Sequence, residues 1–79
     1  MSAKLFNLLC EEKNRIRDVI LPEIDRREQE AYLRNDVEAL KEVIQDRKVI
    51  NRRLAQIVRL KERIYKSWED EEGEKKSRA

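Results

Sequence analysis

The stretch AYLRNDVEAL, residues 31–40, decides the fold because it contains the strongest turn signal in the chain. Asn35 tolerates a left-handed backbone conformation, and either Asn35 or Asp36 can cap a helix that follows. Asn35 and Glu38 also have the spacing of a capping box, and Glu38 places negative charge in the first turn, where the helix dipole favours it. We therefore predict a turn at residues 35–36 with a new helix beginning there.

A long helix is predicted after this turn, from about Asp36 to Glu69. We call the residues expected to face another helix its seam residues. They alternate in steps of three and four, which is the heptad pattern of a helix that packs against another helix. They are Leu40, Val43, Arg47, Ile50, Leu54, Ile57, Lys61, Ile64 and Trp68. Arg47 and Lys61 can keep their charged ends in water while their stems lie along the apolar stripe.

Another helix is predicted before the turn, over residues 2–34, with Ser2 as its N-cap. Its main apolar residues share one helical face: Leu5, Leu9, Ile16, Ile20, Ile24 and Ala31. Pro22 removes one backbone donor and crowds the carbonyl four residues earlier. Because no Gly, Ser or Asn flanks Pro22, we favour a kink within a continuous helix. The alternative is a break at which Pro22 begins a new helix.

The two predicted helices are nearly equal, at about 33 residues or roughly 50 Å each. Equal helices joined by a short turn indicate an all-α protein, an antiparallel two-helix hairpin over residues 1–69 with coiled-coil-like packing. Residues 70–79 have no apolar residue before the last, so we expect a disordered, charged tail there. Apolar residues outside the two stripes favour a second copy or a partner that completes a helical bundle: Phe6, Leu21, Tyr32, Val49 and Leu60.

The composition suits long exposed helices, because 46% of the 79 residues are charged and 39% are apolar, with one Gly and one Pro. Cys10 is the single cysteine, so no intrachain disulfide can form. No apolar run is long enough for a signal peptide or a membrane span, so we expect a cytoplasmic protein. Abundant Glu, Lys, Arg and Ile, with no His, are typical of a thermophile.

The chain has few residues suited to catalysis. It lacks His, the commonest general base and metal ligand. A single Cys without His makes neither a Cys–His pair nor a zinc site, and Gly73 alone cannot form a phosphate-binding loop. We therefore expect no enzyme activity, no metal site and no cofactor. Cys10 is expected to be a small buried residue beside the apolar stripe rather than a reactive thiol.

The strongest functional signal is a concentration of positive charge after the turn. Residues 47–66 hold 8 basic side chains and 1 acidic one. The candidate binding residues are Lys48, Arg52, Arg53, Arg59, Arg63 and Lys66. Four of them follow steps of four, seven and four and form a row about 22 Å long: Lys48, Arg52, Arg59 and Arg63. Such a row could contact successive phosphates of a nucleic acid, or an acidic protein partner.

The alternative is that these charges are solvated or are neutralised within the hairpin. When the chain turns at residues 35–36, residues whose numbers sum to about 71 lie opposite each other. The expected pairs are Arg53 with Asp18, Lys48 with Glu23, and Arg59 with Glu12. Each exposed pair would contribute about 0.2–1 kcal/mol.

Two aromatic residues, Tyr65 and Trp68, interleave with the basic residues. Interleaved aromatics occur on some nucleic-acid-binding surfaces, where they stack on bases. Their positions near the seam favour a packing role instead. For Trp68 a further alternative is an anchor that docks into a pocket of a partner.

The stretches LFNLLCEEKNRIRDVILPEI (residues 5–24) and RRLAQIVRLKERIYKSW (residues 52–68) resemble the helical domain of GINS-type replication subunits. The shared features are a Leu-rich opening with Glu, a Leu-Pro step, and a late helix with spaced Arg, Leu and Ile. The likeness spans about half of the chain and does not include the small β-domain of that family. It implies a small helical accessory subunit of a nucleic-acid machine, such as an archaeal DNA polymerase or replisome factor.

The stretch EQEAYLRNDVEALKEVIQDRKVINRRL, residues 28–54, also resembles flagellar-hook export chaperones. Those helical proteins have a turn of the form D-x-E-A-L followed by a Lys and spaced leucines, and here the turn reads DVEAL followed by Lys41. This resemblance implies a protein that holds a helical client and has no role with nucleic acid.

These observations lead us to expect a non-enzymatic helical accessory or adaptor subunit that binds and stabilises a larger protein complex. That complex could be a DNA replication complex, with the basic face near nucleic acid. The alternatives are an export chaperone or adaptor for a helical client, and a homodimeric four-helix-bundle regulator; no membrane partner is expected. The residues expected to pack against a partner helix are Leu5, Leu9, Ile16, Ile20, Ile24, Leu40, Val43, Ile50, Leu54, Ile57, Ile64 and Trp68.

Overall fold

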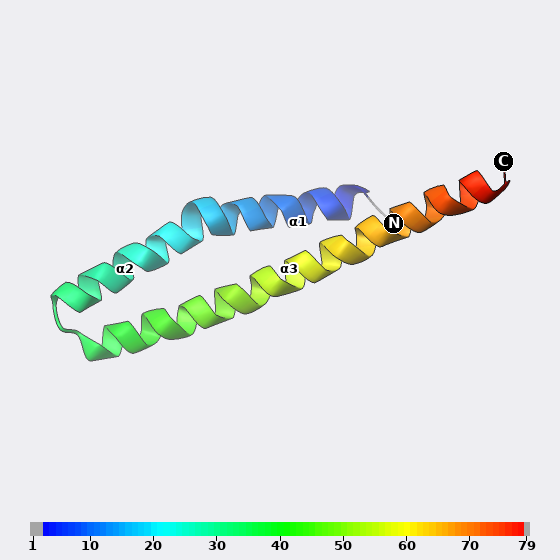
Figure 1. The fold of residues 1–79 in the computed structure, drawn as a ribbon. Coiled ribbons are helices and arrows are strands. Elements are labelled where there is room, and N and C mark those ends of the chain that lie inside the picture. The colour runs from blue at the N-terminus through cyan, green and yellow to red at the C-terminus, as the bar shows by residue number, and fades with distance from the viewer. Residues whose placement is uncertain (1–2, 79) are drawn as a thin grey trace.

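A computed structural model describes the backbone over residues 3–78 and the side chains over residues 3–71. The elements are α1 (Ala3–Arg15), a short π-helix η1 (Ile16–Ile20), α2 (Leu21–Leu33) and α3 (Val37–Arg78) (Figure 1). No strand occurs among the described residues, which confirms the all-α prediction. The predicted N-cap, Ser2, lies outside them.

The chain folds back on itself and forms a long, thin molecule. α1, η1 and α2 follow one another without a gap and form one arm, residues 3–33, which runs back beside α3 (Figure 1). The principal extents are 66 × 16 × 13 Å. The described chain is therefore a single layer of two helical rods, in the shape of a hairpin.

The end of α2 is a Schellman motif built around Asn35. The N–H of Asp36 donates to the carbonyl of Ala31 at 2.9 Å, and the N–H of Asn35 donates to the carbonyl of Tyr32 at 3.1 Å. Asn35 has a φ of 53°, in the left-handed region. Asn enters this region at lower cost than other residues with a Cβ, because its short polar side chain can bond locally. The chain therefore turns at the predicted residues 35–36.

Asp36, rather than Asn35, caps α3. The Oδ1 atom of Asp36 accepts a hydrogen bond from the N–H of Ala39 at 3.1 Å, which is the pattern of an N-cap three residues before its donor. The predicted capping box between Asn35 and Glu38 does not form among the described residues. The reason is that the backbone of Asn35 belongs to the Schellman motif that ends α2, so Asn35 does not occupy the N-cap position of α3.

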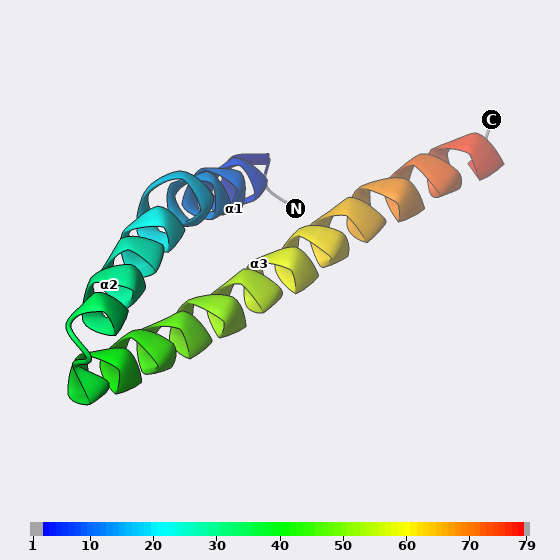
Figure 2. The same ribbon diagram turned by 60° about the vertical axis from the view of Figure 1, so that its left-hand side comes forward.

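The arm continues through Pro22, and its irregularity lies just before that residue, at η1. The N–H of Leu21 donates to the carbonyl of Ile16, five residues back, instead of four. Pro22 has no N–H, and its ring crowds the carbonyl of Asp18, which disfavours a regular α-helical turn there. The arm changes direction at this wide turn (Figure 2). A bend within a continuous helix is therefore present, centred on η1 rather than on Pro22.

The wide turn also keeps the apolar residues of the arm directed toward α3. Ile16 and Ile24 are both buried, with 2% and 3% of their surface exposed, although they are eight residues apart. At about 100° per residue, eight residues of regular α-helix would rotate Ile24 about 80° away from Ile16. The π-helical turn holds one more residue than an α-helical turn, and it absorbs this rotation.

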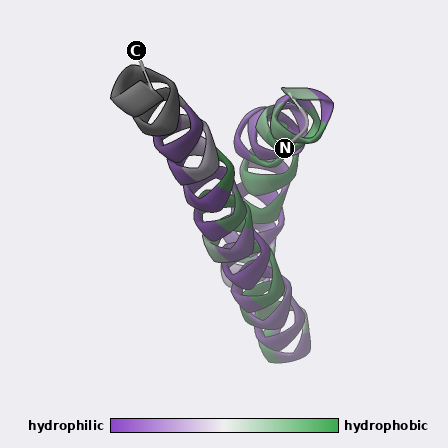
Figure 3. Ribbon diagram, turned by 90° about the vertical axis from the view of Figure 1, so that its right-hand side faces the viewer, coloured by the Kyte–Doolittle hydropathy of each residue, from purple (hydrophilic) through white to green (hydrophobic). Residues whose placement is uncertain are grey.

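The core lies between the arm and α3. Its buried residues are Leu9, Ile16, Ile24 and Ala31 in the arm and Val43, Ile57 and Ile64 in α3. Other apolar residues are partly buried against it: Phe6, Ile20, Leu21, Ile50, Leu54 and Trp68. Hydropathy colouring shows green turns of both rods in the region between them, and purple along the outer side of α3 (Figure 3).

Among the predicted packing residues, Leu40 is half-buried without belonging to the sets above, and Leu5 alone is exposed. Its side chain is 44% exposed, whereas the neighbouring Phe6 packs against the core. Phe6, Leu9, Lys13 and Ile16 follow steps of three, four and three, so Phe6 extends the stripe toward the open end of the hairpin. The larger ring of Phe6 occupies the position that we had predicted for Leu5.

α3 is longer than predicted. Its backbone continues past Glu69 to Arg78, whereas we had expected the helix to end near Glu69. The disorder expected of residues 70–79 stays a prediction, and Ala79 lies outside the described residues. Glu and Lys are good helix formers, and lengthening an existing helix adds a hydrogen bond for each residue that is ordered. A helix that has already formed can therefore continue without apolar contacts.

Candidate binding surfaces

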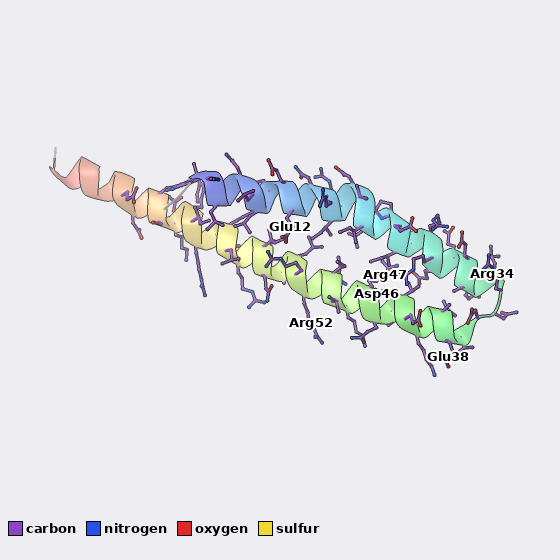
Figure 4. The ribbon with its side chains drawn as sticks, turned by 180° about the vertical axis from the view of Figure 1, so that it is seen from behind. Glu12, Arg34, Glu38, Asp46, Arg47 and Arg52 are labelled. Carbon is purple, nitrogen blue, oxygen red and sulfur yellow. The ribbon has the colours of Figure 1, made fainter. Side chains whose placement is uncertain are left out.

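Three arginines join the arm to α3 through ion pairs with nitrogen–oxygen distances of 2.5–2.9 Å. The pairs are Arg27 with Asp46, Arg47 with Asp25 and Glu28, and Arg53 with Glu12. Glu12, Asp46 and Arg47 lie in the space between the two rods in Figure 4. All of these side chains remain partly in water, so each pair adds little stability. Their main consequence is that these three arginines, which face the arm, are neutralised.

Arg53 pairs with Glu12, and not with Asp18 as we had predicted. The reason is the direction in which each side chain leaves its helix. Glu12 and Arg53 each precede a buried isoleucine, Ile16 or Ile57, by four residues, so both lie near the inner side of their rods. Asp18 follows Ile16 by two residues within η1, which places it on roughly the opposite side of the arm. It therefore points away from α3 and pairs with the arginine before it.

The other two predicted pairs are also absent from the described residues. Lys48 lies nine residues before Ile57 and Arg59 lies two after it, which places them about 180° and 200° around α3. Both are on the outer side, beyond the reach of the arm. Glu23 pairs with Arg26 within the arm instead. Two charged residues at the same height along the two rods thus do not always form an ion pair. Their side chains must also leave the two helices in directions that face each other.

The outer side of α3 keeps five cations that form no ion pair among the described side chains. We call them the basic row: Lys48, Arg52, Arg59, Arg63 and Lys66. All five are exposed, and Arg52 points away from the arm in Figure 4. The sixth predicted binding residue, Arg53, does not belong to the row, because it is half-buried and paired with Glu12. The structure therefore brings five of the six predicted cations together on one face.

An aromatic cluster closes the end of the core that is farthest from the turn. The ring centroids of Phe6 and Trp68 are 5.2 Å apart, with their planes inclined by 49°. The Nζ of Lys61 lies 5.3 Å from the centroid of the Phe6 ring, within the range of a cation–π contact. Trp68 therefore packs inside the hairpin. We had placed Phe6 outside the main stripe, and its spacing of three from Leu9 was the signal that could have identified it.

Two apolar grooves flank the contact between the arm and α3. The Val19 groove, about 380 Å³, lies beside η1, and its most exposed apolar residues are Val19 at 62% and Val49 at 51%. The Tyr65 groove, about 350 Å³, lies beside the aromatic cluster and is lined by Phe6 and by Tyr65, which is 56% exposed. The Val19 groove was not predictable from the sequence, because its shape depends on the bend at η1.

Hydrogen bonds from arginines lower the pKa of three carboxyl groups. In each case that hydrogen bond is the largest cause: Arg53 for Glu12, Arg17 for Asp18 and Arg26 for Glu23. A lowered pKa keeps these carboxylates charged at acidic pH. All three groups are thus charged partners in ion pairs.

The described residues contain no group of three His, Cys, Asp or Glu side chains that could hold a metal ion. Cys10 is a free thiol that is partly buried on α1. The burial that we had predicted for Cys10 is therefore only partial.

Comparison with known proteins gives no relative for this chain. No family model matches it, and neither the curated proteins nor the solved structures yield a match. The resemblances to GINS-type subunits and to export chaperones therefore stay predictions. Over the residues that the structure describes, no helix combines the length and the apolar character needed to cross a membrane.

Proposed function

We propose that this chain is a non-enzymatic adaptor that binds a larger protein subunit through the two apolar flanks of its hairpin. The observation that carries this proposal is its large accessible surface. The chain exposes 6579 Å² for a mass of 9.6 kDa, whereas a compact monomer of this mass exposes about 5,100 Å². The excess of about 1,500 Å² is larger than the roughly 800 Å² that each partner of a standard protein–protein interface buries.

The excess surface includes many apolar side chains on the flanks. A hairpin is one layer thick, so the edges of its core are left open on both sides. Large apolar residues that are at least 36% exposed are Leu5, Leu8, Val19, Tyr32, Leu33, Val37, Ile44, Val49, Val58, Leu60 and Tyr65. On α3, Leu54, Val58 and Tyr65 follow steps of four and seven and form a stripe on one flank. Such a stripe is suited to receive an apolar helix.

The proposed mode of action is mechanical. A partner helix lying along a flank would turn the single layer into a two-layer helical bundle, and the Val19 and Tyr65 grooves would accept its largest side chains. The ion pairs between the arm and α3 would lie at the edges of that contact, where they exclude water at little cost. The adaptor would thereby hold segments of its partner at fixed positions along a rod.

A second copy of the chain is the other candidate for covering these flanks. The heptad spacing on α3, together with its exposed Val58 and Tyr65, would also suit a homodimeric four-helix bundle. The two candidates differ in what lies against Val58, which makes this position suitable for a test.

Site-specific cross-linking in the native host distinguishes the candidates. A photoreactive amino acid at Val58 or Val49 should yield one heterologous cross-linked protein, identified by mass spectrometry. The matched control is Asn14, which is exposed on the outer side of the arm. Val58→Ser should weaken co-purification of that protein while leaving the helical circular dichroism of the purified chain unchanged.

Each outcome has a defined meaning. Cross-links between two copies from Val58, together with a dimeric mass in solution, would favour the four-helix bundle. Cross-links of equal yield from Val58, Val49 and Asn14 would show that the flanks have no preferred partner, and the adaptor proposal would then be wrong.

A further inference from the structure

The basic row occupies a narrow sector of α3, opposite the core. Measured from Ile57 at about 100° per residue, its five cations lie between about 180° and 240° around the helix. From Lys48 to Lys66 the row extends about 27 Å at 1.5 Å per residue. α3 is one uninterrupted helix over this length. The five charges are therefore arranged along a nearly straight line.

The charge of the row is not neutralised locally. Glu62 is the single acidic residue in the segment 47–66; it lies about 40° outside the sector and forms no ion pair among the described side chains. By contrast, Arg47 and Arg53, in the same segment but facing the arm, are both paired with carboxylates of the arm. Lys61, also on the inner side, lies over the Phe6 ring. The fold thus separates these three cations, which contact the arm, from the unpaired cations on the outer side, whose field is directed into solvent.

Acidic residues limit the row at both ends. Before it, Lys41 has a similar angular position, but its Nζ lies 3.6 Å from Glu38. After it, Asp70 follows Lys66 by four residues, so it lies on the same side one turn later. A ligand is therefore expected to contact a limited length of the helix. At 3.4 Å per base pair, 27 Å corresponds to about eight base pairs of a duplex.

The chemistry of the row indicates which polyanion it fits. Its sector contains no aromatic residue, because Trp68 packs against Phe6 and Tyr65 lines a groove on the flank. Binding of single strands relies on aromatic side chains that stack on bases, and the row offers none. An amphipathic helix that lies in a membrane surface buries its apolar face in the bilayer, whereas the apolar face of α3 is turned to the arm.

A rigid, regular polyanion fits best. A flexible acidic peptide would lose conformational entropy when it followed a straight row of cations. A duplex loses much less, since its phosphates are already regularly spaced.

We propose that the basic row binds the phosphate backbone of a nucleic-acid duplex over about eight base pairs, without base-specific contacts. DNA and RNA duplexes share this phosphate chemistry, so they form separate arms of the test. The row lies on the outer side of α3, whereas the adaptor proposal uses the flanks; Lys66 alone also lines the Tyr65 groove. Either proposal can therefore fail while the other stands.

Fluorescence anisotropy with labelled duplexes of roughly 20 base pairs tests the proposal through its salt dependence. Five phosphate contacts predict a slope of log Kobs against log salt of about −4.5, or about 500-fold weaker DNA binding between about 50 and 200 mM KCl. The double variant Arg52→Gln/Arg59→Gln should reduce the slope to about −2.7, or about 40-fold over the same range.

The matched control is Arg17→Gln/Arg26→Gln. It removes the same two charges from exposed positions on the arm, so the net charge falls from +2 to zero in both double variants. The control should keep the slope and the affinity of the original chain. Circular dichroism verifies that both variants stay helical. Comparable binding of DNA and RNA duplexes, or preference for either one, supports recognition of phosphates.

Three results would overturn the proposal. Equal losses in the two double variants would show that only total charge matters. Tighter binding to a single strand than to either duplex would show that stacking dominates. Absence of duplex binding at the lowest salt, with binding to poly-glutamate or to vesicles containing phosphatidylserine, would assign the row to an acidic protein or to a membrane.

Discussion

The guanidinium of Arg53 donates hydrogen bonds to both carboxylate oxygens of Glu12, a residue 41 positions earlier in the chain. The pair links the arm to α3 on the inner side of the hairpin. It also separates Arg53 from the five cations of the basic row, which lie on the other side of the same helix. A charge cluster that is continuous in sequence is therefore divided in space into arginines paired with the arm and cations that face solvent.

The Glu12–Arg53 pair should make stability depend on pH. The hydrogen bond from Arg53 lowers the pKa of Glu12 in the folded chain. The stabilisation is therefore complete above the unfolded pKa and is lost as the pH falls through the folded pKa. We expect Tm to decline below about pH 4.5, near the unfolded pKa of Glu. Glu12→Gln should flatten part of this decline, and should lower Tm at neutral pH.

The control for this measurement is Glu11→Gln, since Glu11 is exposed and forms no ion pair among the described side chains. Asp18 and Glu23 also have lowered pKa values, so some pH dependence should persist in Glu12→Gln. An identical Tm profile for the two variants and the original chain would contradict a stabilising role for the pair.

Ile57 should be among the residues on which the fold depends most. It is fully buried, whereas its neighbour Val58 is 44% exposed. Ile57→Ala removes packed methyl groups and should reduce the free energy of unfolding by about 2–5 kcal/mol. Val58→Ala should change it by less than about 0.5 kcal/mol. Urea unfolding monitored by circular dichroism measures both, and equal changes would mean that α3 is not packed through Ile57.

The wide turn at η1 should be needed only because Ile16 and Ile24 are eight residues apart. In a chain with Pro22→Ala, deletion of Val19 leaves a spacing of seven, which a regular α-helix can place on one side. We expect this deletion to keep Tm within a few degrees of the Pro22→Ala parent.

Deletion of Asn14 in the same parent is the control for the wide turn. It rotates Leu9 and Phe6 by about 100° away from α3 and should cost about 2–5 kcal/mol in unfolding free energy. If deleting Val19 lowers Tm as much as deleting Asn14, then the role of η1 in the fold is not to keep Ile16 and Ile24 on the same side of the arm.

The contact between Phe6 and Trp68 can be followed by fluorescence, because Trp68 is the single tryptophan. Phe6→Ala exposes the indole and should shift its emission to longer wavelength. It should also cost more than Leu5→Ala, which removes an exposed neighbour, because it loses the ring pair, worth about 0.5–1.5 kcal/mol, in addition to the buried area of Phe6. Emission that is unchanged in Phe6→Ala would show that Trp68 does not depend on this ring.

Local features of the fold were predictable from the residues that carry them. A turn at Asn35–Asp36 follows from the conformations and caps that these two side chains allow, and both act within a few residues of their own position. The stripe through Val43, Ile57 and Ile64 follows from the period of the α-helix. Its burial could be predicted because period and polarity together leave one apolar side on α3.

The candidate binding surfaces were less predictable, because they depend on contacts between residues that are far apart in the sequence. The clustering of cations after the turn was evident in the sequence, but their division into paired and unpaired sets was not. The reason is that pairing requires two side chains to meet in angle as well as along the rods, as Glu12 and Arg53 do and Asp18 does not.

What the sequence by itself determined is therefore the all-helical class, the place of the turn and the apolar stripe, since each depends on interactions between near neighbours in the chain. Only the tertiary structure decided that η1 widens the arm, that Phe6 replaces Leu5 beside Trp68, and which cations remain unpaired. These depend on how two rods with fixed helical periods meet, and small rotations about each rod change every contact between them.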